Sequence, residues 1–351
     1  MSTIAELPHS KQRLSPRARF LPGLALAGGV ATAATAMSHF VGLGSAPVLG
    51  IVLGVAVGAI IGPRAILKPG LTIGSSALLR VAVVVLGLEL PLGTIATQGI
   101  RALPIIAVTL GGCLIAAGPI GRRLGIAERV WTLIGVGTGI CGASAIAAVT
   151  PVIEASELEV GYAVATIFLF NVLAVLAFPP LGRLLGMSPH TFGTFAGTAV
   201  NDLSSVVAAA GAYAGSLHTA VITKLTRTLM IVPICVVLRR RCDRAGGSAH
   251  GAREAGDPRF TRRTLTATAQ LVPGFLIVFL AFAALRSLGV VPAGVRADAG
   301  PLATILITVA LSAVGLSIDV RALRRVGPRP VLLGLMLWLI VSGLSLAVQA
   351  L

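Results

Sequence analysis

Long apolar runs, separated by short polar connections, follow one another along almost the whole chain. Each run has the roughly 20 residues that a helix needs to cross the hydrocarbon core of a bilayer. A membrane β-barrel would instead show shorter segments of alternating polarity. Because lipid offers the backbone no hydrogen-bond partners, helices are the expected structure. The runs span residues 20–38, 46–62, 73–92, 102–121, 131–153, 160–181, 192–212, 217–238, 267–286, 300–318 and 331–350.

This pattern predicts an all-α membrane protein of about eleven transmembrane helices, in a single transmembrane domain over residues 20–351. Lys and Arg fall mostly in every second connection, which by the positive-inside rule faces the cytoplasm. The N-terminal tail, 1–19, and the long connection, 239–266, are therefore expected in the cytoplasm, and the C-terminus outside. The first 38 residues also resemble a signal peptide, but their apolar run is longer than is usual there, which favours a retained helix.

The acidic residues between the fifth and sixth runs give a further expectation about sidedness. With eleven crossings, the cluster Glu154, Glu157 and Glu159 would lie outside, opposite the basic connection at 122–129. Arg183, which follows the sixth run, would lie in the cytoplasm.

The composition excludes several other classes of protein. Of the 351 residues, 56% are hydrophobic and 11% charged, against about 25% charged in a soluble domain. The net charge of +16 does not indicate nucleic-acid binding, because the basic residues lie in connections and aromatic residues make up only 4%. No CxxC pair, Cys/His cluster, HExxH, GxSxG or Walker pattern occurs. We therefore expect no metal, no cofactor and no enzymatic activity.

Glycines mark two runs. Gly50, Gly54, Gly58 and Gly62 recur every four residues in the second run and predict a face of close helix packing. The fifth run contains a Gly-rich stretch, 135–144, which matches GxGxxG but has no strand or βαβ unit around it, so we reject dinucleotide binding. Each glycine weakens a helix by about 1 kcal/mol relative to Ala. This stretch predicts an interrupted helix of the kind that forms transporter sites, against the alternative of an unbroken close crossing.

Ionisable residues inside the membrane are functional candidates by default. Lys224 and Arg227 lie three residues apart in the eighth run and therefore share a helical face. Asp202 lies in a polar island of the seventh run together with Asn201, Ser204 and Ser205, which resembles a second interrupted segment. Two interpretations stay open. Asp202 could pair with Arg227 or Lys224 to fix helix packing, or these groups could bind substrate and couple its movement.

The predicted substrate site combines the buried cations, the Gly-rich stretch and the polar island. Asp202 is the predicted coupling residue, while Asn171 and Glu89 are weaker candidates. The hydroxyl groups of the site could instead bond to their own helix, which is their commoner use. The predicted substrate-binding residues are Lys224, Arg227, Gly137, Thr138, Gly139, Cys141, Gly142, Ser144, Asn201 and Ser205.

Several motifs, in order along nearly the whole chain, resemble the YeiH-type bacterial membrane proteins, which are often labelled sulfate exporters. The most specific is Gly139-Ile140-Cys141-Gly142-Ala143-Ser144, followed by Pro151-Val152-Ile153. The others are Pro22-Gly23-Leu24-Ala25-Leu26, Leu78-Leu79-Arg80 with Gly87-Leu88, Lys224-Leu225 with Arg227 and Pro233, and Gly315-Leu316 with Leu323 and Gly327.

The resemblance implies a multi-pass protein of the bacterial cell membrane with the inverted repeats of a secondary transporter, similar to bile-acid symporters and sodium/proton antiporters. Runs two to six and seven to eleven would be the repeats, with runs five and ten interrupted. An echo between Gly87-Leu88 and Gly315-Leu316 does not fit that register. The chain also departs from the family, which usually has His-Glu at Asn201-Asp202, Gln at Ser205, and often Arg at Glu89. Proton coupling through that His is therefore not carried over.

The leading hypothesis is a secondary transporter, acting as an exporter, of a small inorganic or organic anion such as sulfate or a sulfonate. Lys224 and Arg227 would supply positive charge, and Asp202 would balance it or carry a coupling proton or sodium ion. The first alternative is a cation/proton antiporter that uses Asp202. The second, from another class, is a membrane scaffold or sensor that transports nothing. The expected partners are the anion, the lipid bilayer and, as an open alternative, further copies of the chain.

Overall fold

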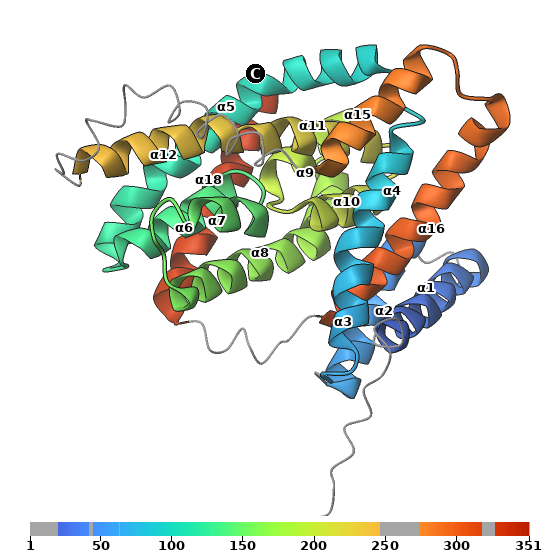
Figure 1. Ribbon diagram of the computed structural model, residues 1–351, viewed down its shortest axis with the longest axis horizontal. Helices are drawn as coiled ribbons and strands as arrows, with labels where there is room; N and C mark the ends of the chain where they lie inside the picture. Colours follow the sequence, from blue (N-terminus) through green and yellow to red (C-terminus); the bar gives the residue numbers. More distant parts are fainter. Residues whose placement is uncertain (1–19, 42–44, 63, 246–273, 318–326, 351) are drawn as a thin grey trace, which may run out of the picture.

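A computed structural model describes residues 20–41, 45–62, 64–245, 274–317 and 327–350, with the backbone alone over 239–245. Within these ranges the protein is built from helices and contains no strand (Figure 1). The helices are α1 (Leu21–Val41), α2 (Ala46–Ile61), α3 (Lys68–Thr72), the π-helical η1 (Ile73–Leu78), α4 (Leu79–Leu86), α5 (Leu92–Arg123), α6 (Glu128–Gly139), α7 (Ala143–Val149), α8 (Glu157–Leu184), α9 (Pro189–Ala199), α10 (Leu203–Gly211), α11 (Leu217–Leu229), α12 (Ile231–Ala245), α15 (Gly274–Ser287), α16 (Ala293–Ser317) and α18 (Pro328–Ala350).

As far as the structure describes them, the predicted apolar runs correspond to a helix or to a series of consecutive helices. Among the described residues, seven helical stretches are long and apolar enough to cross a membrane, and α2 and α15 are shorter apolar helices. The all-α membrane fold is therefore confirmed. The tail, 1–19, and the part of the predicted cytoplasmic loop beyond Ala245 lie outside the described residues.

The helices form two groups that share an interface. The first group contains α1, α2, α4, α15 and α16, and the second contains α5, α6, α8, α9, α11 and α18 (Figure 1). α10 packs against helices of both groups. The shared interface is apolar, since Ile51 and Leu79 of the first group belong to the same buried cluster as Val207, Val221 and Leu225.

Glycines allow α2 and α16 to cross at close range, as the spacing in the second run predicts. A Cβ atom at Gly54 would lie 2.6 Å from the carbonyl oxygen of Ser312, and one at Gly58 would lie 3.1 Å from that of Leu316. On the other side of the crossing, Gly315 lies directly against the backbone of Ile51. Larger residues at these positions would push the two backbones apart.

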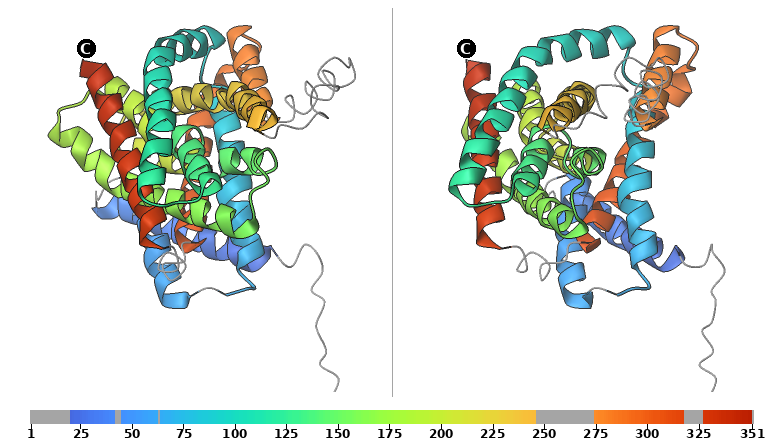
Figure 2. Two further views of the ribbon diagram at one scale, coloured as in Figure 1. Left: turned by 90° about the vertical axis from the view of Figure 1, so that its left-hand side faces the viewer. Right: turned by 60° about the vertical axis from the view of Figure 1, so that its left-hand side comes forward.

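α5 and α18 run side by side in opposite directions (Figure 2). Gly125, just beyond the end of α5, lies beside the guanidinium group of Arg329 at the start of α18. Further along, Gly112 lies against Leu344 near the end of α18. The C-terminal end of α5 and the N-terminal end of α18 therefore lie at the same end of the molecule.

α8 runs in the same direction as α18. Gly334, early in α18, contacts Phe170, and Trp338 stacks on Phe178 with ring centroids 5.1 Å apart. The start of α8 therefore lies at the same end as the end of α5. Between them the chain enters along α6 and returns along α7, where Ile146 packs against Gly137. We call this unit, residues 128–149, hairpin A.

α9 and α10 form a second hairpin, residues 189–211, which we call hairpin B. Its two ends lie together: Arg183 Nη2, before α9, donates to the carbonyl oxygen of Ala212, 2.8 Å away and just after α10. The hydroxyl group of Tyr213 donates to the carbonyl oxygen of Met187. α8 connects the two hairpins and runs from one end of the molecule to the other. Hairpin B therefore enters from the end opposite to hairpin A.

The hairpins correct the prediction that runs five and seven cross the membrane. The four helices contain 12, 7, 11 and 9 residues, and at 1.5 Å per residue each is shorter than the roughly 30 Å hydrocarbon core. Apolar content and total length alone do not distinguish such a pair of half-helices from one crossing helix. Both predicted interruptions, in runs five and seven, are present.

Two further expectations are wrong. Run ten is not interrupted, because α16 is continuous from Ala293 to Ser317. The acidic cluster at 154–159 lies at the same end as Arg122 and Arg123 of α5, because hairpin A returns to that end. Arg183, in the last turn of α8, accordingly lies at the opposite end of the molecule.

Candidate functional site

The tips of the two hairpins meet inside the second group of helices. The tip of hairpin A comprises residues 140–142, and the tip of hairpin B comprises residues 200–202. A Cβ atom at Gly142 would lie 3.4 Å from the Cβ atom of Asp202. Gly142 has a φ of 65°, a conformation that glycine adopts without strain and that allows the chain to reverse here.

α11 brings two cations to the hairpin tips. It runs beside α9 in the same direction, with Thr219 against Gly193 and Thr223 against Gly197. The absence of side chains at these two glycines lets the helices approach closely. As a result the next residues on this face of α11, Lys224 and Arg227, lie beside the ends of α6 and α9, and both are completely buried.

Lys224 joins the two tips directly. Its Nζ atom donates hydrogen bonds to the carbonyl oxygens of Ile140 and Val200, each at 2.8 Å. Ile140 follows the last residue of α6, and Val200 follows the last residue of α9. These carbonyl groups have no partners within their own helices because each helix ends there.

Arg227 binds the same two helix ends one turn further along α11. Its Nε atom donates to the carbonyl oxygen of Gly139 at 2.6 Å, and Nη2 donates to that of Thr138 at 2.5 Å. Its Nη1 atom donates to the carbonyl oxygen of Thr198 on hairpin B. A helix C-terminus carries about half a negative charge, so the two cations offset the dipoles of α6 and α9.

Asp202 is the N-cap of α10. One carboxylate oxygen accepts from the Ser205 backbone N–H at 2.7 Å and from the Ser204 hydroxyl group at 2.6 Å. The other accepts from the Ser205 hydroxyl group at 2.8 Å and from Asn171 Nδ2 at 2.9 Å. No ion pair in the described part of the chain joins Asp202 to Lys224 or Arg227. Packing is therefore fixed by cations on helix ends rather than by the ion pair that the sequence suggested.

Asn201 is the polar group of the site that is left without partners. Its side chain is 1% exposed, and neither Oδ1 nor Nδ2 has a hydrogen-bond partner among the described residues. Only its backbone N–H is bonded, to Asn171 Oδ1 at 3.2 Å. Leaving a buried amide unpaired costs roughly 1–3 kcal/mol. A group that persists at this cost at a hairpin tip indicates a position where a ligand or a water molecule completes the bonding.

The other predicted site residues contribute in different ways. Thr138 and Gly139 act through their carbonyl groups, while Gly137 packs against Ile146 and Cys141 is buried in the tip of hairpin A. Ser144 is exposed and lies outside the contact between the tips. Ser205 is bound to Asp202, as described above.

Two contributions to the site are weakly marked or unmarked in the sequence: the side chain of Asn171 and the backbone carbonyl groups of hairpin B. Asn171, a weaker candidate, bonds to both Asn201 and Asp202 from α8. Its position in the middle of a long apolar run was the available signal. The carbonyl groups of Thr198 and Val200 could not be identified from the sequence. Every residue has a backbone carbonyl group, and it becomes free to bind a side chain only where a helix ends.

The fold and the site define a multi-pass helical membrane protein in which two inverted hairpins meet within the helix bundle. A family model described as Conserved hypothetical protein 698 matches residues 22–334. A UPF0324 membrane protein of Streptococcus agalactiae is 37% identical over 339 residues, covering 94% of this chain and 97% of the relative. A UPF0324 membrane protein of Fusobacterium nucleatum is 34% identical over 351 residues, covering 94% of this chain and 97% of the relative. The chain belongs to the UPF0324 membrane protein family, the YeiH-type family that its motifs resemble.

Proposed function

We propose that this protein is a secondary transporter that exports a small inorganic or organic anion, such as sulfate or a sulfonate, across the bacterial cell membrane. The observation that carries the proposal is the buried, unpartnered amide of Asn201 where the two hairpin tips meet. The family and the fold directly support a membrane protein with several apolar helices.

The arrangement of the hairpins supports transport. Irregular backbone at membrane depth is tolerated where it is buried in protein or lines a water-filled cavity. Discontinuous helices of opposite orientation are a common way for transporters to build a site that either side of the membrane can reach. Here each hairpin covers one side of the meeting point, so a shift of one hairpin would open that side alone.

The charge balance at the tips supports an anion. With Lys224 protonated, Lys224 and Arg227 together carry two positive charges. Asp202 and the C-terminal ends of α6 and α9 carry about two negative charges, and the N-terminal end of α10 adds about half a positive charge. In this protonation state the tips keep an excess of about half a positive charge, which favours an anion. Asn201 Nδ2 would donate to that anion.

The second candidate is a cation/proton antiporter in which Asp202 binds the ion. The observation in its favour is that Asp202 is the carboxylate at the tips and directly follows Asn201, whose Oδ1 atom has no hydrogen-bond partner among the described residues. Against it, the Asp202 carboxylate already accepts four hydrogen bonds. Those donors would have to leave before a cation with its own shell of oxygen ligands could bind.

The test is flux into proteoliposomes with purified protein and the variant Asn201→Ala. The Asn201 side chain makes no hydrogen bond, so its removal should leave the melting temperature unchanged or slightly raised. Sulfate, thiosulfate, taurine, chloride and sodium would each be supplied as labelled substrate against a matching gradient. Thr304→Ala is the control, because Thr304 lies on α16 beside the far end of α10 and away from the hairpin tips.

We expect flux of one of the anions with the wild type and with Thr304→Ala, and a loss of at least tenfold in Asn201→Ala at unchanged stability. Full flux in Asn201→Ala would show that the Asn201 side chain does not bind the transported anion. Flux of sodium alone would support the antiporter. If no substrate is transported and none stabilises the protein, the scaffold or sensor interpretation would replace the proposal.

A further inference from the structure

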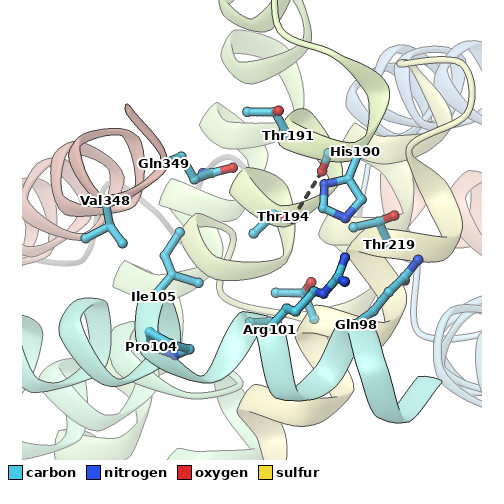
Figure 3. A pocket seen from close by; sticks show the side chains of 12 residues that line it. Gln98, Arg101, Pro104, Ile105, His190, Thr191, Thr194, Thr219, Val348 and Gln349 are labelled. Atoms are coloured by element: carbon cyan, nitrogen blue, oxygen red, sulfur yellow. Dashed lines mark hydrogen bonds between the residues drawn. The ribbon is translucent and has the colours of Figure 1, made fainter. Parts of the chain in front are cut away.

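A cavity of about 390 Å³ with polar and apolar walls lies beside hairpin B, separate from the contact between the tips. α5, α9, α11 and α18 form its walls (Figure 3). The cavity lies at the end of the molecule that carries the C-terminus, because Val348 and Gln349 line it. Thr223, which also lines it, directly precedes Lys224, so the cavity approaches the hairpin tips along α11.

The ionisable side chains in the lining are both basic. Arg101 of α5 and His190 of α9 lie on opposite sides of the space (Figure 3), and no Asp or Glu lines the cavity. Arg101 is exposed, and within the described residues no hydrogen bond or ion pair holds its guanidinium group. A permanent cation that faces a concave, otherwise neutral space is an attractive site for a negative group.

Hydrogen-bonding groups surround the two basic side chains. Thr219 and Thr223 contribute hydroxyl groups from α11. Gln98 of α5 also lines the cavity, and its Oε1 atom is buried behind the lining surface without a hydrogen-bond partner in the described part of the chain. A rotation of the amide group would turn this oxygen towards the cavity. An anion alone would leave this acceptor unsatisfied, whereas a ligand with a donor of its own would bond to it.

We propose that this cavity binds a small organic monoanion that also carries a hydrogen-bond donor, such as a short hydroxylated carboxylate or sulfonate. The Arg101 guanidinium group binds the anionic head, Thr219 and Thr223 donate to it, and Gln98 Oε1 accepts from the hydroxyl group of the ligand. The volume lies at the lower end of the roughly 300–1,000 Å³ usual for small-molecule sites. It exceeds what a bare inorganic anion needs.

This inference deepens the proposed function, because it places the first binding position of the anion on the side that carries the C-terminus. His190, Thr191 and Thr194 belong to α9, so one wall of the cavity is hairpin B itself. A ligand that bridges Arg101 and hairpin B would therefore favour one position of that hairpin. Binding in the cavity does not itself require transport, which allows the two proposals to be tested separately.

The experiment is isothermal titration of the purified full-length protein in detergent. The probes are 2-hydroxyethanesulfonate and ethanesulfonate, which differ in the hydroxyl group, at constant ionic strength. The variants are Arg101→Gln and Gln98→Leu. Arg123→Gln is the matched control, because Arg123 is an exposed arginine at the other end of the same helix. Circular dichroism melting of each variant shows whether it is folded.

We expect the wild type and Arg123→Gln to bind 2-hydroxyethanesulfonate more tightly than ethanesulfonate. Arg101→Gln should weaken the binding of both probes by roughly tenfold or more, since a charged hydrogen bond is lost. Gln98→Leu should remove the preference for the hydroxylated probe. Unchanged binding in Arg101→Gln, or no binding of either probe to the wild type at millimolar concentration, would overturn the inference.

The outcomes separate this inference from the proposed function. If Asn201→Ala loses flux but keeps the binding of 2-hydroxyethanesulfonate, both proposals are supported. If anion flux occurs and Arg101→Gln changes neither flux nor binding, the cavity inference alone fails. If the cavity binds the probe but no anion is transported, the proposed function alone fails.

Discussion

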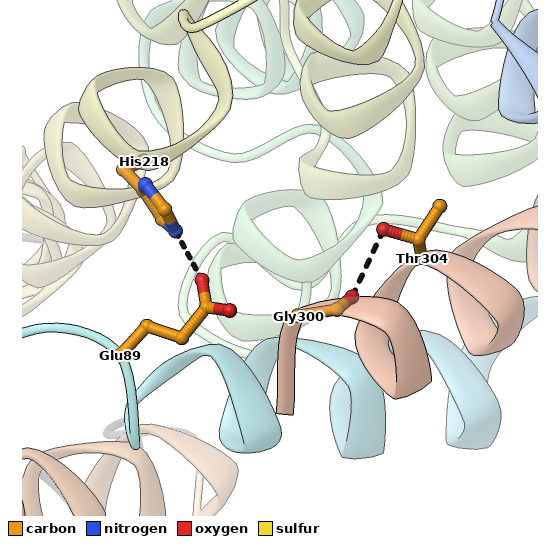
Figure 4. Close-up of polar contacts among 4 residues, drawn as sticks. All are labelled: Glu89, His218, Gly300 and Thr304. Carbon is orange, nitrogen blue, oxygen red and sulfur yellow. Dashed lines mark hydrogen bonds and ion pairs between the residues drawn. The ribbon is translucent and has the colours of Figure 1, made fainter. Parts of the chain in front are cut away.

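Glu89 and His218 form a hydrogen bond across 129 positions of the chain, with His218 Nε2 2.7 Å from Glu89 Oε2 (Figure 4). Glu89 lies between α4 and α5, and His218 lies in the first turn of α11. The carboxylate also lies against Gly300 of α16, where any side chain would displace it. The pair therefore connects the first group of helices to the helix that holds both hairpin tips.

Because the pair is partly exposed, with side chains 22% and 43% accessible for Glu89 and His218, we expect a small contribution to stability. A double-mutant cycle with Glu89→Gln and His218→Asn should give a coupling energy of about 0.2–1 kcal/mol at a pH where His218 is protonated. Thermal unfolding in detergent measures it. Glu157→Gln, which changes an exposed carboxylate outside the pair, is the control. A coupling energy indistinguishable from zero would contradict the contact.

The hairpins predict which loops share a side of the membrane. In a background without native cysteines, Ala127→Cys and Glu157→Cys flank hairpin A and should react with a membrane-impermeant maleimide from the same side. Leu185→Cys and Ala214→Cys flank hairpin B and should react from the opposite side. Labelling of intact and of permeabilised cells measures this. If Ala127→Cys and Glu157→Cys react from opposite sides, α6 and α7 cross the membrane as one helix.

Hydrophobic patterning located the helices because each buries apolar surface in lipid or protein and needs a fixed length to do so. Interruptions were also predictable, since Gly139 and Gly142, like the polar pair Asn201 and Asp202, are poorly suited to a continuous helix. The direction taken after each interruption was not predictable. It depends on contacts with α8, α11 and α18, which no local sequence pattern contains.

The same reasoning explains the candidate site. Lys224 and Arg227 could be selected because charge is rare and costly in such runs. Their partners could not be selected, since carbonyl oxygens belong to every residue and become acceptors for side chains only where a helix ends. Arg101 lies in a connection between two apolar runs, where no local pattern distinguishes it from other basic residues. Only the packing of α5, α9 and α11 around a common space shows that it lines a cavity.

The crossing of α2 and α16 predicts a sharp contrast between two glycines. Gly54→Ala places a Cβ atom 2.6 Å from the Ser312 carbonyl oxygen and should destabilise the protein by about 1–3 kcal/mol. Gly29→Ala in α1, where no atom lies within 4 Å of the added Cβ, should be neutral or slightly stabilising because of its higher helix propensity. Thermal unfolding in detergent compares them. Equal melting temperatures would indicate that the helices cross further apart.

Replacing Arg227, one of the two side chains that bind both hairpins, should be costly. Arg227→Met leaves the carbonyl groups of Thr138, Gly139 and Thr198 without donors, and we expect a loss of about 3 kcal/mol or more. Arg227→Lys keeps the charge but offers fewer hydrogen-bond donors. Its melting temperature should therefore lie between those of the wild type and Arg227→Met. Arg123→Met, at an exposed site, should be nearly neutral. The order of melting temperatures is the measurement, and an Arg227→Met variant as stable as the wild type would show that Arg227 does not fix the hairpins.

The Asp202→Asn variant distinguishes two roles of Asp202, the N-cap of α10 and the coupling group of a transporter. Asn is as good an N-cap as Asp, so its side-chain oxygen should still accept from the Ser205 backbone N–H. Its new NH₂ group would meet Asn171 Nδ2 or the Ser205 hydroxyl group, and we expect a loss of about 1 kcal/mol. Asp202→Ala removes the cap as well and should cost more.

For the anion transporter, Asp202→Asn should retain flux, since removing a negative charge leaves the tips more positive. For the cation/proton antiporter, the same change should abolish cation-dependent flux, because the amide neither binds a proton nor balances a cation. Proteoliposome flux with an imposed pH gradient, measured beside the melting temperature, distinguishes them. Retained anion flux with little change in stability would assign Asp202 to holding α10 in place. Loss of all flux at unchanged stability would assign it to coupling instead.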